Sequence, residues 1–102
     1  MLKKTYSKNK SKCKVTFKFD PAGENANIDT IQVVGSFNGW GQLKKHFLKL
    51  RKDGSYSLSV NLESDSSYEY KYLVNENEWF NDNKAEGHVW NIFGSQNALL
   101  VV

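Results

Sequence analysis

Strict alternation of apolar and polar residues constrains this chain more than any other feature. From Ser55 to Leu62 every even position is apolar and every odd position is polar. A period of two is typical of a β-strand with one face buried and the other in water. The same alternation or a short apolar run predicts further strands at 13–19, 31–34, 47–50, 68–72 and 98–102.

Turn-forming residues separate these runs at short spacing. They include Asp20-Pro21-Ala22-Gly23, Asn38-Gly39, Lys52-Asp53-Gly54 and Ser64-Asp65-Ser66-Ser67. No segment carries an apolar stripe at helical spacing over three turns. We therefore expect a single all-β domain, an antiparallel sandwich of six to eight strands, with an open barrel as the alternative.

The charge is unevenly distributed along the chain. Six lysines and no acidic residue fall within the first 14 positions, whereas residues 15–102 hold eight basic and eleven acidic side chains. We expect a lysine-rich N-terminal segment at 1–12, frayed or forming an edge strand, followed by the folded domain at 13–102. Because this places the positive charge outside the fold, nucleic-acid binding is disfavoured.

The cellular location is inferred from what the sequence lacks. The chain has 102 residues and no apolar run of membrane-spanning length, and the basic residues near Met1 are not followed by an apolar stretch. Its one cysteine, Cys13, has no partner for an internal disulfide. These features predict a cytoplasmic protein without a membrane partner.

Catalytic chemistry finds little support in the sequence. The two histidines, His46 and His88, and Cys13 do not stand at metal-ligand spacing, so we expect no metal site and no cofactor. Acidic residues flank Trp79, but an asparagine-rich stretch should keep them hydrated and ionised, unlike a glycosidase acid. Neither a nucleophile elbow nor a phosphate-binding glycine loop is present.

The three tryptophans stand in or beside expected loops. Trp40 lies between Gly39 and Gly41, and Trp79 and Trp90 lie outside the alternating runs. An indole face stacks on the apolar C–H face of a sugar, and neighbouring amides bind its hydroxyls. The residues alone leave two interpretations: the indoles bind carbohydrate, or they cap the ends of the sandwich.

Three motifs occur in a recognisable order. They are Val33–Trp40 (VVGSFNGW), Tyr68–Val74 (YEYKYLV) with Trp79 soon after, and Phe93–Val101 (FGSQNALLV). Over residues 13–102 this pattern resembles carbohydrate-binding module family 48. That family, also called the isoamylase N-terminal or early set domain, includes the glycogen-binding domain of the AMP-activated protein kinase β subunit.

The resemblance implies an immunoglobulin-like antiparallel β-sandwich that binds α-1,4-linked glucan. It implies that Trp40 and Trp79 stack on glucose rings and that Lys71 binds sugar hydroxyls. The last motif implies an apolar contact, a hydroxyl and an amide from Phe93, Ser95 and Asn97, with Phe93 replacing the family's leucine. Family members are often fused to a catalytic domain, and because the sequence stops after the last expected strand, we expect no enzyme.

The expected function is therefore non-catalytic binding of glycogen, starch or maltooligosaccharides. One alternative is a protein-interaction module of the same fold that docks onto a glycogen-metabolising enzyme or another partner. The lysine-rich segment would then contact an acidic surface. Another alternative is single-stranded nucleic-acid binding by exposed aromatic residues, which the acidic balance of residues 15–102 disfavours.

Overall fold

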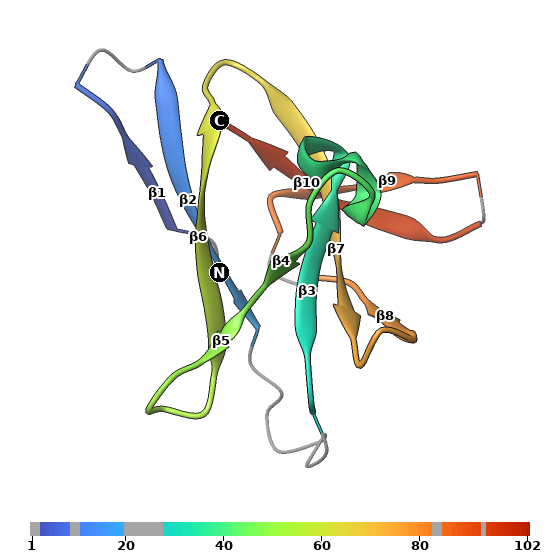
Figure 1. Cartoon of the computed structure of the whole chain (residues 1–102). Helices are drawn as coiled ribbons and strands as arrows, with labels where there is room; N and C mark the ends of the chain where they lie inside the picture. Colours follow the sequence, from blue (N-terminus) through green and yellow to red (C-terminus); the bar gives the residue numbers. More distant parts are fainter. Residues whose placement is uncertain (1–2, 9–10, 20–27, 83–84, 93) are drawn as a thin grey trace.

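The chain folds into two antiparallel β-sheets (Figure 1). The computed structural model describes residues 3–8, 11–19, 28–82, 85–92 and 94–102. The described strands are β1 (Lys3–Tyr6), β2 (Lys12–Phe19), β3 (Ile31–Gly35), β4 (His46–Phe47), β5 (Lys49–Leu50), β6 (Tyr56–Glu63), β7 (Ser67–Val74), β8 (Glu78–Phe80), β9 (Gly87–Trp90) and β10 (Gln96–Val101). A short 3-10 helix, η1 (Ser36–Gly41), follows β3.

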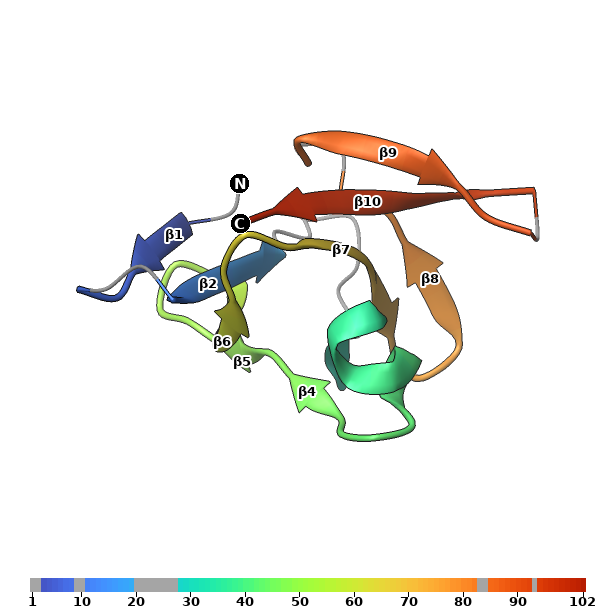
Figure 2. The ribbon, with the colours of Figure 1, turned by 90° about the horizontal axis from the view of Figure 1, so that it is seen from above.

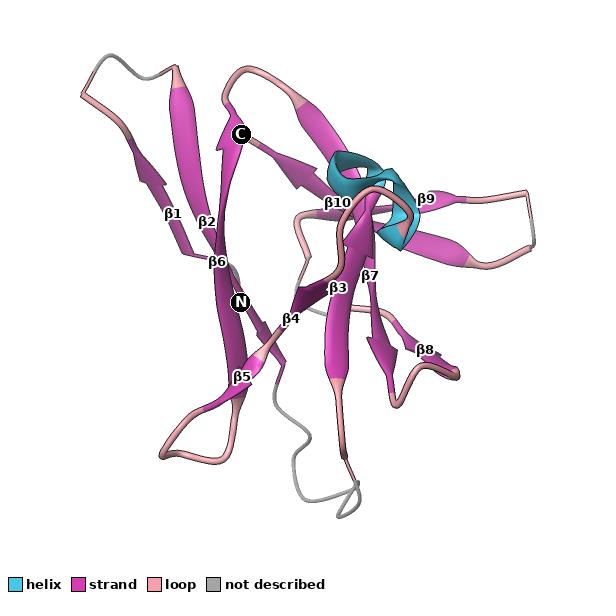
Figure 3. Cartoon of the chain, in the orientation of Figure 1, coloured by secondary structure: helices cyan, strands magenta, loops and turns pink. Residues whose placement is uncertain are grey.

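The first sheet has the strand order β1-β2-β6-β5 and the second has the order β4-β3-β7-β10-β9. Strand β8 pairs with the second half of β7. Figure 2 shows η1 beside β7 and the β9–β10 hairpin extending away from the first sheet. The predominance of strand over helix is clear in Figure 3. The predicted all-β antiparallel sandwich is confirmed.

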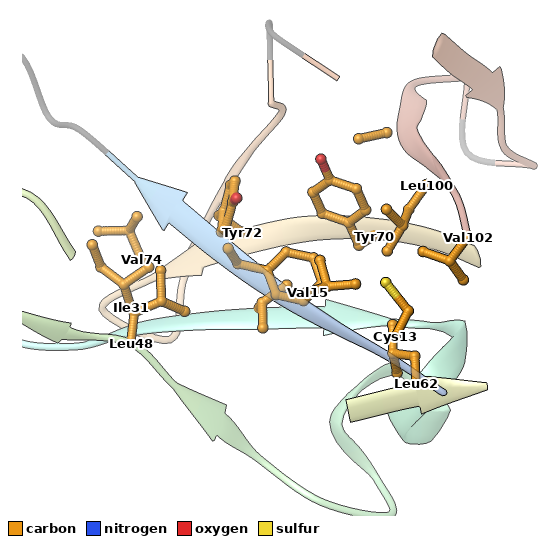
Figure 4. Close-up of a cluster of buried hydrophobic side chains, with 13 residues drawn as sticks. Cys13, Val15, Ile31, Leu48, Leu62, Tyr70, Tyr72, Val74, Leu100 and Val102 are labelled. Atoms are coloured by element: carbon orange, nitrogen blue, oxygen red, sulfur yellow. The ribbon is translucent and has the colours of Figure 1, made fainter. Parts of the chain in front are cut away.

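The core lies between the two sheets (Figure 4). Alternate residues of β2, including Val15 and Phe17, are fully buried, as the sequence pattern predicts. They meet Tyr70 and Tyr72 of β7, and the Phe17 and Tyr70 rings pack edge to face with centroids 5.2 Å apart. Burial raises the pKa of both tyrosines well above its usual range, so their hydroxyls stay neutral.

The described chain contains more strands than the six to eight expected. The run at 47–50 is divided between β4 and β5, because Leu48 turns into the core between them while each strand joins a different sheet. Strands β8 and β9 were not predicted as separate elements, and β1 was expected only as one of two alternatives. Strands β8 and β9 have three and four residues, too few for alternation to stand out from the surrounding polar sequence.

Part of the lysine-rich segment is a strand. Lys3–Tyr6 pairs antiparallel with β2, and the Lys4 ammonium bonds the Glu86 carboxylate and the Val101 carbonyl oxygen. Of the two interpretations offered for this segment, the edge strand is therefore the one observed for residues 3–6. The inference that the positive charge lies outside the fold is wrong, because Lys3 and Lys14 stand on paired strands.

No described helix is long and apolar enough to cross a membrane.

Candidate functional site

The loop after β3, which contains the 3-10 helix η1, turns the chain so that Trp40 faces outward. Gly39, Trp40 and Gly41 all have positive φ, at 62°, 58° and 87°. This left-handed backbone suits glycine and is uncommon for a bulky side chain. Phe37 of the same loop points inward and stacks on Phe17 with ring centroids 5.6 Å apart. The loop is thus anchored on one side and presents an indole on the other.

Asn38 holds the loop in this shape. Its Oδ1 accepts hydrogen bonds from the backbone N–H groups of Gly35, at 3.0 Å, and Gly41, at 3.1 Å. Its Nδ2 donates to the Val33 carbonyl oxygen at 3.1 Å and to Nδ1 of His46 at 3.0 Å. The side chain is 2% exposed. A buried amide with these four bonds fixes the start and the end of the turn around Trp40.

His46 takes part in this arrangement as a neutral side chain. Because its Nδ1 accepts a hydrogen bond from Asn38 Nδ2, the proton of the neutral ring stands on Nε2. Burial, and secondarily the charge of Lys44, lower the pKa of His46 below its ordinary value of 6.5. The neutral form that the Asn38 bond requires is therefore the favoured form near pH 7.

Trp40 and Trp79 line the same groove. The groove is a half-open depression of about 240 Å³ on the outer face of the second sheet. Trp79 reaches it from β8, directly across from Leu73 of β7. Trp40 is 40% exposed and Trp79 is 53% exposed, so each keeps free surface for a ligand. The lining residues are Gln32, Val34, Trp40, Gly41, Lys45, Leu73, Glu76 and Trp79.

An ion pair adds charge to the groove without giving it an excess of one sign. The Lys45 ammonium lies 3.8 Å from the Glu76 carboxylate, and both side chains are about 60% exposed. Lys45 comes from the connection before β4 and Glu76 from the turn between β7 and β8. The pair offers a cation and a carboxylate that bind hydroxyl groups as hydrogen-bond donor and acceptor.

A set of hydrogen-bonded side chains, here called the polar ladder, lies on the same sheet. Its members are Glu69, Lys71, Asn91, Ser95 and Asn97. The Ser95 hydroxyl oxygen accepts from Nζ of Lys71 at 3.3 Å and from Nδ2 of Asn91 at 2.8 Å. Nδ2 of Asn91 also donates to Oδ1 of Asn97 at 3.0 Å, and Nδ2 of Asn97 donates to Glu69 at 3.1 Å.

The ladder adjoins the groove through β7. Lys71 lies directly across from Val34, a lining residue, and two positions before Leu73, which lines the groove on the same side of the strand. Lys71 and Ser95 are half-buried, whereas Asn97 is 6% exposed. Lys71 and Ser95 are therefore the ladder residues that keep surface for a ligand, and Asn97 mainly holds its neighbours.

Five of the six predicted site residues thus lie on one face. Trp40 and Trp79 are in the groove, and Lys71, Ser95 and Asn97 are in the ladder. Phe93 lies outside the described residues.

The sequence analysis did not name Asn91 or Glu69 as site residues. Asn91 precedes Ser95 by four residues in the β9–β10 hairpin, and its Oδ1 accepts from the Ser95 backbone N–H at 3.2 Å. Glu69 stands two positions before Lys71, which for a strand means the same side. The strand period could have identified Glu69, but an asparagine that bonds across a hairpin leaves no periodic pattern.

Trp90 does not join the other two indoles. Trp90 pairs with Gln96, and the next pair along the hairpin is Val89 with Asn97 of the polar ladder. Because successive strand residues point to opposite faces, Trp90 points away from the face that carries the ladder. It is 70% exposed. No group of three or more histidine, cysteine or acidic side chains within the described ranges could hold a metal ion.

No protein-family model and no curated protein matches this chain. Solved structures do resemble it. The ferric enterobactin esterase of Salmonella typhimurium aligns with a TM-score of 0.75 at 11% identity, over 98% of this chain and 33% of that one. The enterobactin esterase of Shigella flexneri, solved with 2,3-dihydroxy-N-benzoyl-serine, aligns with a TM-score of 0.74 at 13% identity, over 98% of this chain and 32% of that one. This chain spans about a third of these proteins, and at such identity the likeness shows the fold.

Proposed function

We propose that this domain binds α-1,4-linked glucan without chemically changing it. The observation that carries the proposal is the groove that Trp40 and Trp79 line together. Two indoles, one from η1 and one from β8, are each partly exposed and offer apolar faces to successive sugar rings of one chain. The sequence motifs resemble carbohydrate-binding module family 48, and this resemblance is the reason for proposing α-1,4-linked glucose as the sugar.

Polar groups next to the indoles suit the hydroxyl rim of a sugar. The Lys71 ammonium has three N–H groups and donates one hydrogen bond to the Ser95 hydroxyl oxygen, so the other N–H groups can bond a ligand hydroxyl. The Lys45–Glu76 pair supplies a donor and an acceptor inside the groove itself. Because Glu76 balances the charge of Lys45 inside the groove, a neutral ligand fits better than an anion.

The size of the groove predicts modest affinity. About 240 Å³ is below the range of roughly 300–1,000 Å³ of sites that enclose a drug-sized ligand. A half-open groove of this size covers one or two sugar rings and leaves the rest of the polymer in water. We expect dissociation constants on the order of micromolar to millimolar for short oligosaccharides.

The two histidines support a binding role over a catalytic one. Nδ1 of His46 is bonded to Asn38, and Nε2 of His88 lies 2.9 Å from the Asp82 carbonyl oxygen. Neither ring is positioned by these bonds against a serine or cysteine nucleophile. The esterases that share the fold are about three times longer than this chain, so their activity is not carried over with the fold.

The test is a titration of intrinsic tryptophan fluorescence with maltoheptaose and β-cyclodextrin. Cellohexaose, the β-1,4-linked counterpart, is the control for linkage. 2,3-Dihydroxy-N-benzoyl-serine is included because a flat benzoyl ring also stacks on an indole. A saturable change with the α-glucans alone supports the proposal. Equal response to cellohexaose, response to the benzoyl-serine alone, or no response at tens of millimolar sugar refutes it.

A second candidate is protein docking, for example onto a glycogen-metabolising enzyme. One observation favours it: the β9–β10 hairpin exposes Trp90 to 70% and Ile92 to 93%. Analytical ultracentrifugation with purified glycogen phosphorylase tests this role. A complex that Trp90→Ala and Ile92→Ser together abolish supports docking, and sedimentation of the two proteins as separate species contradicts it for that enzyme.

The cytoplasmic location remains a prediction, for which subcellular fractionation is the measurement.

A further inference from the structure

The outer side of the first sheet carries the positive charge that the sequence concentrates near its start. In β2 the side chains of Cys13, Val15 and Phe17 are fully buried, so the alternate residues point away from the core. Those outward residues include Lys14 and Lys18, both exposed. The lysines therefore stand in a row along the outer side of a strand.

Neighbouring strands extend this row into a surface. Lys3 of β1 lies directly across from Thr16 of β2, and Lys49 of β5 lies across from Ser57 of β6. Nε of Arg51 donates to the Ser57 hydroxyl oxygen at 2.6 Å, which lays the guanidinium over this side of the sheet. We call this surface the basic face; its cationic residues are Lys3, Lys12, Lys14, Lys18, Lys49 and Arg51.

Only part of this charge is neutralised within the described chain. Glu63 pairs with Lys12, and Asp53 lies 3.7 Å from Lys18 while also accepting a hydrogen bond from the Ser55 hydroxyl. Lys14 and Lys49 make no ion pair among the described residues. Six cations against two carboxylates leave the basic face with an excess of positive charge.

We propose that the basic face is a docking surface for an acidic segment of a protein partner. Aspartate and glutamate side chains of that segment complement the unpaired lysines. The basic face is on the first sheet and the tryptophan groove is on the second, with the core between them. A partner and a ligand in the groove can therefore be bound at the same time, and the proposal does not depend on what the groove binds.

The residues between the lysines favour a protein partner over a nucleic acid or a membrane. Thr16, Ser59 and Asn61 occupy outward positions, and the Thr16 and Ser59 hydroxyls are 2.8 Å apart. Hydroxyls and amides of this kind bond carboxylates and main-chain groups. The outward positions of β2 and β6 hold no aromatic side chain for stacking bases and no apolar side chain for insertion into lipid.

The dimensions of the basic face predict a weak, charge-driven complex. Four strands span roughly 14 Å across and eight residues span roughly 26 Å along, which gives on the order of 400 Å². That is about half of what one partner contributes to a stable interface of standard size. Attraction between exposed charges must then supply much of the affinity, so binding should weaken steeply with salt.

The experiment measures fluorescence anisotropy of labelled poly-L-glutamate titrated with the full chain at 50 and 300 mM NaCl. The variants are Lys14→Glu and Lys49→Glu, both on the basic face. Lys44→Glu is the matched control, because Lys44 is exposed on the connection between η1 and β4 and its reversal changes the net charge equally. Labelled oligo(dT) and phosphatidylserine vesicles are tested in parallel.

We expect saturable binding at 50 mM salt that weakens at least tenfold at 300 mM. Each basic-face reversal should weaken it about fivefold or more, and Lys44→Glu less than twofold. Equal losses in all three variants would mean that net charge alone is responsible, which overturns the proposal. Absence of poly-L-glutamate binding would also overturn the proposal. The same holds if oligo(dT) or the vesicles bind more tightly than poly-L-glutamate and the same two variants abolish that binding.

Discussion

Removing one indole at a time should separate the groove from the rest of the surface. We expect Trp40→Ala and Trp79→Ala each to weaken maltoheptaose binding, and Trp90→Ala to leave it unchanged within twofold. Trp90 is the matched control because it is even more exposed, at 70%, but points to the opposite face of its hairpin. The three variants therefore remove the same side chain from different places.

The magnitude follows from the exposed area. An indole side chain has about 250 Å² of surface, so the 40% exposed at Trp40 is roughly 100 Å² and the 53% at Trp79 is roughly 130 Å². A sugar stacked on one ring face covers about half of that, or roughly 50–65 Å². At about 25 cal/mol per Å² the loss is roughly 1.3–1.6 kcal/mol, which corresponds to about tenfold in Kd.

Isothermal titration calorimetry is the assay, since it does not depend on the fluorescence that the substitutions remove. Thermal unfolding of each variant shows whether the fold is retained. Two results would refute the reasoning. In the first, folded Trp40→Ala and Trp79→Ala both keep the parent affinity; in the second, Trp90→Ala loses as much as they do.

Three further predictions concern the loop that presents Trp40. Asn38→Ala leaves two backbone N–H groups and a carbonyl without their partner, so urea unfolding should show a loss of about 2–4 kcal/mol. Burial, with the charge of Lys44, lowers the pKa of His46 in the folded protein below the unfolded value of 6.5. The free energy that the neutral His46 ring contributes to folding should therefore be fully present above pH 6.5. It should be lost as the pH falls through the folded pKa, and melting between pH 8 and 5 should show a dependence that His46→Gln removes. A methyl group added in Gly35→Ala would overlap the Glu69 carbonyl oxygen, so unfolding should reveal a loss of at least about 1–3 kcal/mol.

The sequence predicted the fold well because one period governed most of it. Alternation located β2, β6 and β7, which form the centres of the two sheets, to within about two residues. It failed for β8 and β9, whose pairing is decided by the longer strands beside them rather than by their own residues. Short edge elements are set by tertiary contacts, which local patterns do not record.

The candidate site was predictable in its residue types and less so in their connections. Trp40 and Trp79 stand 39 positions apart, and only the pairing of β8 with β7 brings the second indole to the groove. Asn97 was expected to contact sugar, but its amide is bonded on one side to Asn91 and on the other to Glu69. Which polar side chain stays free for a ligand depends on the hydrogen bonds that its neighbours make. The spacing of residues along the sequence does not reveal those bonds.

The charge distribution was misjudged for a related reason. Six lysines near the start of a chain are common in unstructured leaders, and no local pattern near Lys3 predicted a strand there. Strand β1 forms because β2 offers it an edge, and the Lys4 bonds to Glu86 and Val101 attach it to the opposite sheet. The pairing converts a charged segment into a charged surface, on which the docking proposal rests.

Trp40, the tryptophan between two glycines, adopts a strained backbone conformation. A left-handed backbone at a residue with a side chain costs about 1–2 kcal/mol, and Trp40 adopts it at φ 58°. The flanking Gly39 and Gly41 take the same region without that cost, and Asn38 offsets the remainder through its bonds across the turn. Strain that the surroundings hold in place is found mostly at functional positions, and here it exposes an indole beside a second one across a groove.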